Sequence, residues 1–249
     1  MSVRIESIMV EFFSDLELLG PTDPASTSRA IKIAAPSADA LIVDAGCGTG
    51  RQTFQLLQET SATVVATDLH FSMLASLRRL SEERGVSDRF HVAQADMGAL
   101  PFRPESIDLL WSEGAIYNIG FEWGLRTWRP LLRPGGHLCI TEAAYFKDDP
   151  PEAVRELWES EYPAITTQAR LEEQVKECGY SLVDSFRLPK SAWEAFYDPV
   201  VQHIEELDEA WSVDHDRRQV LSALRDEIDI FRRYGDSYGY VFLVLQRPE

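Results

Sequence analysis

A glycine-rich loop follows an apolar run in the stretch "LIVDAGCGTGRQT", residues 41–53. Its pattern is D-x-G-x-G-x-G, from Asp44 to Gly50. Glycine has no Cβ, so the backbone of such a loop can lie directly against a ligand. The dinucleotide fingerprint G-x-G-x-x-G fails, because Arg51 stands where its third glycine would fall when counting starts at Gly46. The Gly-Lys-Ser/Thr of a phosphate-binding loop is missing too. The loop is therefore either a tight turn or one wall of a pocket for a ligand without phosphates.

Two further carboxylates stand at the ends of the next two apolar runs. Asp68 closes "TVVATD", and Asp96 closes "RFHVAQAD" and is followed by Met97. A carboxylate at the position of Asp68 can accept hydrogen bonds from both hydroxyls of a ribose. Asp96 can accept from the exocyclic amine of a base, with the Met97 thioether as a soft apolar face. Each aspartate alone could instead cap the segment that follows it. Together they predict a nucleoside pocket.

Polar side chains also follow the fourth apolar run, "SIDLLWS". Glu113 comes directly after it and is the best candidate for an acid–base or orienting group. Tyr117 is a second catalytic candidate, and Asn118 beside it is a candidate for contact with the substrate. The alternatives are that Glu113 caps the following segment or bonds to backbone, and that Tyr117 and Asn118 only pack.

The elements that must position these residues alternate between strands and helices. A continuous apolar run such as "ALIVDAG" is typical of a strand buried on both faces of a parallel sheet. We therefore predict a doubly wound α/β fold with helices on both faces of a mostly parallel, seven-stranded sheet, whose last strand is antiparallel and lies at one edge. The expected strands of the first half are 40–46, 63–68, 89–96, 106–112 and 136–143, and the expected helices are 51–59, 71–84 and 121–132.

The two ends of the chain depart from this alternation. We expect one domain over residues 1–249, in which 38–145 form the cofactor-binding core. Residues 1–37 are expected to be a helical cover, with helices at 3–19 and 27–35. The half that faces the substrate is expected at 146–249. Its expected elements are helices at 151–161 and 167–178, a strand at 180–189, a helical insertion at about 191–234, and the closing strand "YGYVFLVLQ".

The composition limits the partners of this chain. It has 249 residues, 45% of them hydrophobic, and a net charge of −17. A surface that binds nucleic acid needs clustered Lys and Arg, and no run reaches the roughly 18 apolar residues of a membrane span. The N-terminus has no signal-peptide layout. Three distant cysteines fit a reduced, cytoplasmic chain, and no metal-ligand spacing is present. As partners we expect a small molecule, no nucleic acid, no membrane insertion and no metal, while a homodimer stays open.

Four stretches carry a family resemblance: "VDAGCGTG", "ATDLH", "AQADMGALPF" and "LLRPGGHL". They resemble the successive motifs of the Rossmann-like, class I S-adenosylmethionine-dependent methyltransferases, over residues 38–145. The stretch from "WSEGAIYNIG" to "RPGGHL" resembles a bacterial and archaeal small-molecule subgroup near the ubiquinone-biosynthesis type. The resemblance implies S-adenosylmethionine as cofactor, S-adenosylhomocysteine as product, and transfer of a methyl group by in-line displacement to a small-molecule acceptor.

The resemblance also implies which residues hold the cofactor. These are Asp44, Gly46, Cys47, Gly48, Arg51, Gln52, Asp68, Leu69, Met73, Asp96, Met97 and Ser112.

Bulky aromatic residues gather from the fourth strand onward, where a substrate cover would have to exclude water. With Asn118, the expected substrate contacts are Trp123, Trp158, Tyr162, Trp193 and Tyr197. Their alternative role is to form the core of the added helices. Two other functions stay open, namely a non-catalytic protein that binds S-adenosylmethionine or S-adenosylhomocysteine, and a protein methyltransferase. A pure binder would not need the polar rim from Ser112 to Asn118.

Overall fold

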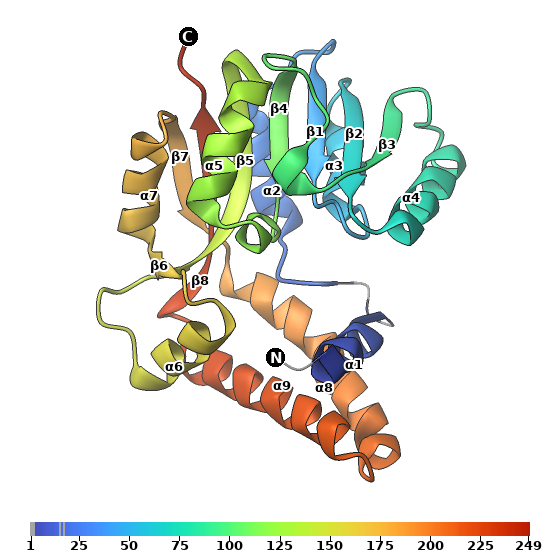
Figure 1. Cartoon of the computed structure of the whole chain (residues 1–249), viewed down its shortest axis with the longest axis vertical. Coiled ribbons are helices and arrows are strands. Elements are labelled where there is room, and N and C mark those ends of the chain that lie inside the picture. Colours follow the sequence, from blue (N-terminus) through green and yellow to red (C-terminus); the bar gives the residue numbers. More distant parts are fainter. Residues whose placement is uncertain (1–2, 15, 17) are drawn as a thin grey trace. The chain divides into compact units, whose positions relative to one another are not determined.

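The computed structural model describes residues 3–14, 16 and 18–249 (Figure 1). These residues pack into two compact units. The sheet unit consists of Asp23–Ala144, Thr166–Leu188 and Tyr240–Glu249. The helical unit consists of the described part of Met1–Thr22, with Tyr145–Ile165 and Pro189–Gly239.

One sheet forms the centre of the sheet unit, with the strand order β3-β2-β1-β4-β5-β8-β7 (Figure 1). The pairings from β3 to β5 are parallel, and β8 runs antiparallel to β7. The predicted fold class is confirmed, but the expectation that the last strand lies at one edge is wrong, because β8 lies between β5 and β7 and the edge strand is β7. The path has the seven strands expected, and β6 pairs with β5 beside it as an eighth. The strands are β1 (Leu41–Ala45), β2 (Thr63–Asp68), β3 (Phe90–Gln94), β4 (Ile107–Ser112), β5 (Leu132–Tyr145), β6 (Thr166–Thr167), β7 (Ser181–Arg187) and β8 (Tyr238–Gln246).

Buried apolar side chains set the register of the central strands. Ile42 of β1 lies opposite Val64 of β2 and Leu109 of β4, and all three side chains are buried. Burial on both faces of the sheet is what a continuous apolar run predicts. Because the strands are parallel, the segments that follow β1, β2, β3 and β4 all start at the same edge of the sheet.

The helices of the sheet unit lie close to their expected positions. α2 begins three residues earlier than expected, because the carboxylate of Asp23 accepts the Ser26 N–H at 2.8 Å and Pro24 suits the first helical position. The expected helix 121–132 ends at Trp128. The helices are α2 (Pro24–Ala34), α3 (Arg51–Glu59), α4 (Phe71–Glu83), α5 (Phe121–Trp128) and α7 (Gln168–Glu177), with short 3-10 turns η1 (Met97–Ala99), η2 (Ile116–Asn118) and η3 (Arg129–Leu131).

Strand β5 begins at Leu132, four residues before the expected start. Leu132 already pairs with Ile107, and a register shift then brings His137 opposite Leu109. The "RPGG" stretch therefore lies within strand β5, where the register of pairing with β4 shifts.

The helical unit contains α1 (Val3–Ser14), α6 (Glu152–Glu161), α8 (Lys190–Trp211) and α9 (His215–Tyr234). The prediction that the first helix continues to residue 19 is wrong. α1 ends at Ser14, whose hydroxyl donates back to the Glu11 carbonyl at 2.7 Å, and residues 15 and 17 lie outside the described part. The expected stretch 191–234 is two helices, since Asp214 caps α9. None of the described helices has the length and apolar character that a membrane crossing needs.

Candidate functional site

The glycine loop between β1 and α3 has a backbone that favours glycine. Gly46 and Gly50 have φ values of +74° and +78°. A Cβ on Gly46 would lie 2.7 Å from the Cβ of Ala115, and one on Gly50 would lie 2.3 Å from Cδ2 of Leu77. The loop is therefore packed tightly against helix α4 and against the segment that follows β4.

Asp68 joins the end of β2 to this loop. Its Oδ2 accepts the Gly48 N–H at 3.0 Å, and its Oδ1 accepts the His70 N–H at 2.9 Å. The side chain is 11% exposed. A carboxylate oxygen can accept two hydrogen bonds, so Oδ2 can accept a further donor beside the loop. Asp68 therefore contacts the glycine loop at the end of β2.

Asp44 is buried beneath the loop. The hydroxyl of Thr53, on α3, donates to its Oδ2. Burial raises the pKa of Asp44 to about 7, the hydrogen bond from Thr53 lowers it, and the nearby charge of Asp68 raises it further. Sequence analysis did not single out Thr53, although its position on the first turn of α3 places it beside the strand end.

The turn η1 places Asp96 and Met97 at the same edge of the sheet. Oδ1 of Asp96 accepts the Gly98 N–H at 2.8 Å. Asp96 therefore caps the turn that follows it, which is the alternative role named for it in the sequence analysis. The Met97 thioether faces the glycine loop, since its Cε and Sδ would lie 3.7 and 3.8 Å from a Cβ on Gly46. The indole N–H of Trp128 donates to the Met97 carbonyl at 2.8 Å. Hydrogen bonds to Asp96 and from Trp128 therefore both hold the turn η1 in place.

Glu113 collects hydrogen bonds from three elements. Its Oε1 accepts the hydroxyl of Thr27 at 2.9 Å and the indole N–H of Trp111 at 3.0 Å, and its Oε2 accepts the amide of Gln52 at 3.4 Å. Burial raises the pKa of Glu113 to about 7, although these hydrogen bonds lower it. The side chain caps no helix. Thr27 lies 86 residues away in the sequence, and no local pattern identifies it.

The other expected cofactor residues differ in exposure. Ser112 is fully buried, and its hydroxyl donates to a carbonyl at the end of β1 at 2.9 Å. Cys47 is 6% exposed, and burial raises the pKa of its thiol well above the ordinary range, which disfavours the thiolate form that a nucleophile needs. Arg51 is exposed at the start of α3, Leu69 is 58% exposed, and Met73 is partly buried on α4.

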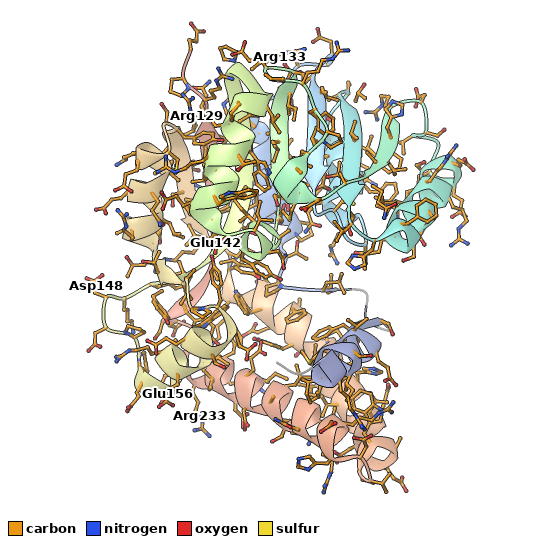
Figure 2. All side chains as sticks on the ribbon, in the orientation of Figure 1. Arg129, Arg133, Glu142, Asp148, Glu156 and Arg233 are labelled. Atoms are coloured by element: carbon orange, nitrogen blue, oxygen red, sulfur yellow. The ribbon has the colours of Figure 1, made fainter. Side chains whose placement is uncertain are left out.

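Tyr117 and Asn118 lie on the turn η2. The side-chain amide of Asn118 donates to the Ala115 carbonyl at 2.9 Å, which closes the turn. Tyr117 is 42% exposed. Partial burial raises the pKa of its phenol, a hydrogen bond with Asn118 lowers it, and the carboxylate of Glu142 on β5 (Figure 2) raises it.

Four of the expected substrate contacts belong to the helical unit, namely Trp158, Tyr162, Trp193 and Tyr197. The rings of Trp193 and Tyr197 lie 6.0 Å apart, and both side chains are buried. Trp158 packs edge-on against Tyr238 at 5.5 Å between ring centroids. The Trp158 indole nitrogen and the Tyr238 hydroxyl have no hydrogen-bond partner among the described residues, which is unusual for buried polar atoms. Trp123 belongs to the sheet unit and lies against Gly98.

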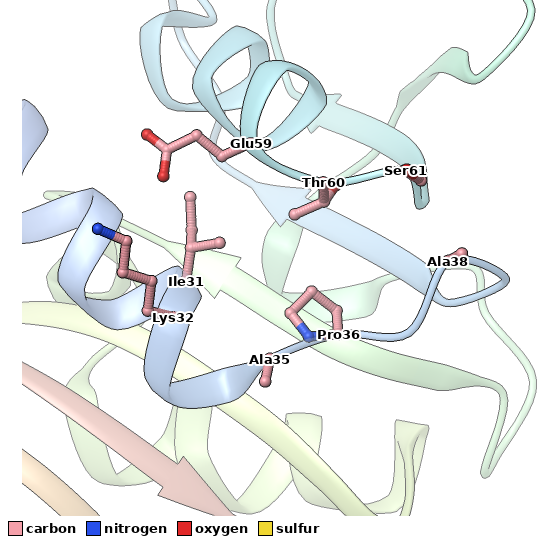
Figure 3. A pocket seen from close by; sticks show the side chains of 8 residues that line it. All are labelled: Ile31, Lys32, Ala35, Pro36, Ala38, Glu59, Thr60 and Ser61. Atoms are coloured by element: carbon pink, nitrogen blue, oxygen red, sulfur yellow. The ribbon is translucent and has the colours of Figure 1, made fainter.

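A cavity of about 500 Å³ opens elsewhere on the sheet unit (Figure 3). It is lined by Ile31, Lys32, Ala35, Pro36, Ala38, Glu59, Thr60 and Ser61. These residues end α2 and α3 and precede β1 and β2, so the cavity lies at the amino ends of the strands. The candidate site lies at their carboxyl ends. Among the described residues, no group of three His, Cys, Asp or Glu side chains is placed to hold a metal ion.

The core sequence matches that of known methyltransferases. A family profile described as a methyltransferase domain matches residues 42–136. Residues 42–136 are therefore a methyltransferase domain. The ubiquinone/menaquinone biosynthesis C-methyltransferase UbiE of Hahella chejuensis is 30% identical to this methyltransferase domain and its flanks over 154 residues, which are 61% of this chain and 61% of the relative. The chain spans 38–65% of the length of the first curated relatives that it matches.

Solved structures share the fold of this chain at low identity. A methyltransferase from Geobacter sulfurreducens, solved with S-adenosylhomocysteine, has a TM-score of 0.79 at 18% identity, covering 96% of this chain and 97% of that one. The 4+2 cyclase SpnF has a TM-score of 0.73 at 18% identity, covering 98% and 92%. At these identities the likeness concerns the fold alone.

Proposed function

We propose that this chain is an S-adenosylmethionine-dependent methyltransferase that acts on a small molecule by in-line displacement. The observation that carries the proposal is the contact between strand ends. Asp68 accepts the Gly48 N–H of the glycine loop, and the Met97 thioether faces Gly46 of the same loop. This arrangement offers a carboxylate for ribose hydroxyls and a soft apolar face for a base, without a phosphate-binding group.

The donor set fits the cofactor proposed for it. Asp68 would hold the ribose, Asp96 the amine of the adenine, and Met97 the ring. The glycine loop would approach the methionine part through its backbone. When bound, S-adenosylmethionine supplies an already activated methyl group, so the protein has mainly to align the acceptor about 3 Å from it and exclude water.

Glu113 is the group proposed to hold or move a proton. A carboxyl group with a pKa of about 7 is half ionised near neutral pH, where a general base works best. A base is needed only where the acceptor enters protonated. Tyr117 and Asn118 are proposed to contact the acceptor. For the aromatic side chains of the helical unit (Trp158, Tyr162, Trp193 and Tyr197), contact with the acceptor stays a prediction from the sequence. The buried, unpaired cysteines support a cytoplasmic location.

Two measurements test the proposal. S-adenosylhomocysteine should bind and raise the melting temperature by mass action, as seen by calorimetry and thermal unfolding. Isotopically labelled S-adenosylmethionine should then transfer label to a component of a small-molecule extract, read by mass spectrometry. Absence of binding at millimolar ligand would overturn the cofactor assignment.

Binding without methyl transfer is the second candidate function. We retain this candidate because a protein with the same fold is named as a 4+2 cyclase, so the fold alone does not imply methyl transfer. Tight binding of S-adenosylhomocysteine with no label in any extract, small-molecule or protein, would support it. Label in protein alone would instead support a protein acceptor.

A further inference from the structure

Trp123 lies beside the aspartate proposed to bind the adenine. A Cβ placed on Gly98 would be 3.1 Å from Cη2 and Cζ3 of the Trp123 indole and 3.2 Å from Oδ1 of Asp96. The indole and the carboxylate therefore border the same space above Gly98. The indole can lie this close to the turn because residue 98 is a glycine, since a Cβ there would require the ring to shift by a few tenths of an ångström.

The helix that carries Trp123 is fixed against this turn. Trp128, five residues later on α5, is fully buried and donates its indole N–H to the Met97 carbonyl at 2.8 Å. Trp123 is 51% exposed, whereas Trp111, Trp128 and Trp193 are buried. A large flat ring that is held in place and left half in water beside a carboxylate is suited to cover a flat ligand that carries an amine.

We propose that Trp123 is a wall of the base pocket and contacts the adenine of the methyl donor, not the methyl acceptor. The inference rests on the proposed function. The edge of the adenine would lie at Asp96, which accepts from its exocyclic amine, and the ring would lie against the indole. Met97, whose thioether faces Gly46, would contact the same adenine ring from the side of the glycine loop.

A cycle of two ligands and two proteins tests this assignment. The ligands are S-adenosylhomocysteine and S-ribosylhomocysteine, which lacks the base. The proteins are the wild type and the Trp123→Ala variant, with binding measured by calorimetry. Base stacking on an aromatic ring predicts that the variant binds S-adenosylhomocysteine about 5- to 100-fold more weakly. The same substitution should leave the affinity for S-ribosylhomocysteine unchanged.

Two further variants separate contact from folding. Trp123→Phe keeps an aromatic face and should recover most of the affinity. Gly98→Ala should weaken S-adenosylhomocysteine selectively, since its methyl group displaces the indole while the backbone N–H that Asp96 accepts is retained. Both Trp123 variants should melt within a few degrees of the wild type, because the substituted ring is half exposed.

The outcomes distinguish this inference from the proposed function. If the wild type binds no S-adenosylhomocysteine, the proposed function fails. If the wild type binds it and Trp123→Ala binds it equally well, the proposed function stands and the inference is overturned. Equal losses for both ligands would also overturn it, because the effect would then not involve the base.

Discussion

At Glu113 a carboxylate is held by neutral donors. The hydroxyl of Thr27, the indole of Trp111 and the amide of Gln52 are all uncharged, and burial dominates the rise of its pKa to about 7. A carboxyl group whose pKa is raised by folding holds its proton more tightly in the folded state than in the unfolded chain. Its contribution to stability is therefore complete below pH 4.5 and is lost as the pH rises through about 7.

Glu113→Gln should remove this pH dependence. The amide keeps the shape and stays neutral, so the variant should gain about 1–3 kcal/mol of unfolding free energy over the wild type at about pH 8, and little at about pH 5. Denaturant unfolding at the two pH values measures it. If the unfolding free energies of the two proteins changed equally between the two pH values, the raised pKa of Glu113 would be contradicted. Should Glu113 also act as a base, turnover falls in the variant while S-adenosylhomocysteine binds as before.

The predicted role of Asp68 is tested by binding. Asp68→Ala removes the charged acceptor proposed for the ribose hydroxyls and the partner of the Gly48 N–H. Charge-assisted hydrogen bonds of this kind predict a loss of about 10- to 100-fold in affinity for S-adenosylhomocysteine. His70→Ala is the matched control, because His70 also contacts Asp68 but its side chain is 69% exposed. Equal affinity of Asp68→Ala and wild type would mean that the aspartate only holds the loop.

Single residues were predictable from sequence where they close a strand. Asp44, Asp68 and Asp96 stand next to recognisable apolar runs, so their common edge followed from the parallel sheet alone. The donors to Glu113 were not predictable in this way. Thr27 is 86 residues from Glu113 in the sequence, and the packing of α2 brings the two side chains into hydrogen-bond contact.

Among the elements, the glycine loop depends on helix α4. Gly50 has a φ of +78°, and a Cβ there would lie 2.3 Å from Cδ2 of Leu77. Gly50→Ala adds a steric conflict with a buried side chain to the strain of a left-handed backbone. Gly85 has a similar φ of +66° with nothing near its Cβ position, so Gly85→Ala carries the backbone strain alone.

Gly50→Ala should therefore destabilise the protein more than Gly85→Ala does. The difference expected is about 1–3 kcal/mol, which is typical of overpacking. Equilibrium unfolding in denaturant measures both variants. A difference near zero would show that α4 yields easily and that the loop needs only the backbone freedom of glycine.

The boundaries of helices and strands were predicted best where the residues that end an element agree with its hydrophobic periodicity. α3 and β2 match their expected bounds, and α4 ends one residue early. The boundaries missed are those set by contacts. β5 starts early because Leu132 pairs with Ile107 of the neighbouring strand β4. α1 ends early at Ser14, whose hydroxyl donates a hydrogen bond to the Glu11 carbonyl of the same helix. The first contact joins residues far apart in the sequence, whereas the second lies within three residues of the chain.

At the scale of the whole molecule, the order of the strands followed from general rules for α/β folds, and the division into two packed units did not. The net charge of −17 is a property of the whole chain that the sequence states directly. Such a charge attracts cationic ligands over distances that salt shortens, from about 30 Å at 0.01 M to about 8 Å at 0.15 M.

This field should distinguish the cofactor from its product. S-adenosylmethionine carries one more positive charge than S-adenosylhomocysteine, at its sulfonium, and the candidate site holds the carboxyl groups of Asp44, Asp68 and Glu113. The affinity for S-adenosylmethionine should therefore fall more steeply with salt than that for S-adenosylhomocysteine, which serves as the matched control. Calorimetric titrations at several NaCl concentrations and fixed pH give the two slopes. Equal slopes would mean that the charge of the chain does not reach the site, and the acidic composition would then have no part in choosing the methyl donor over its product.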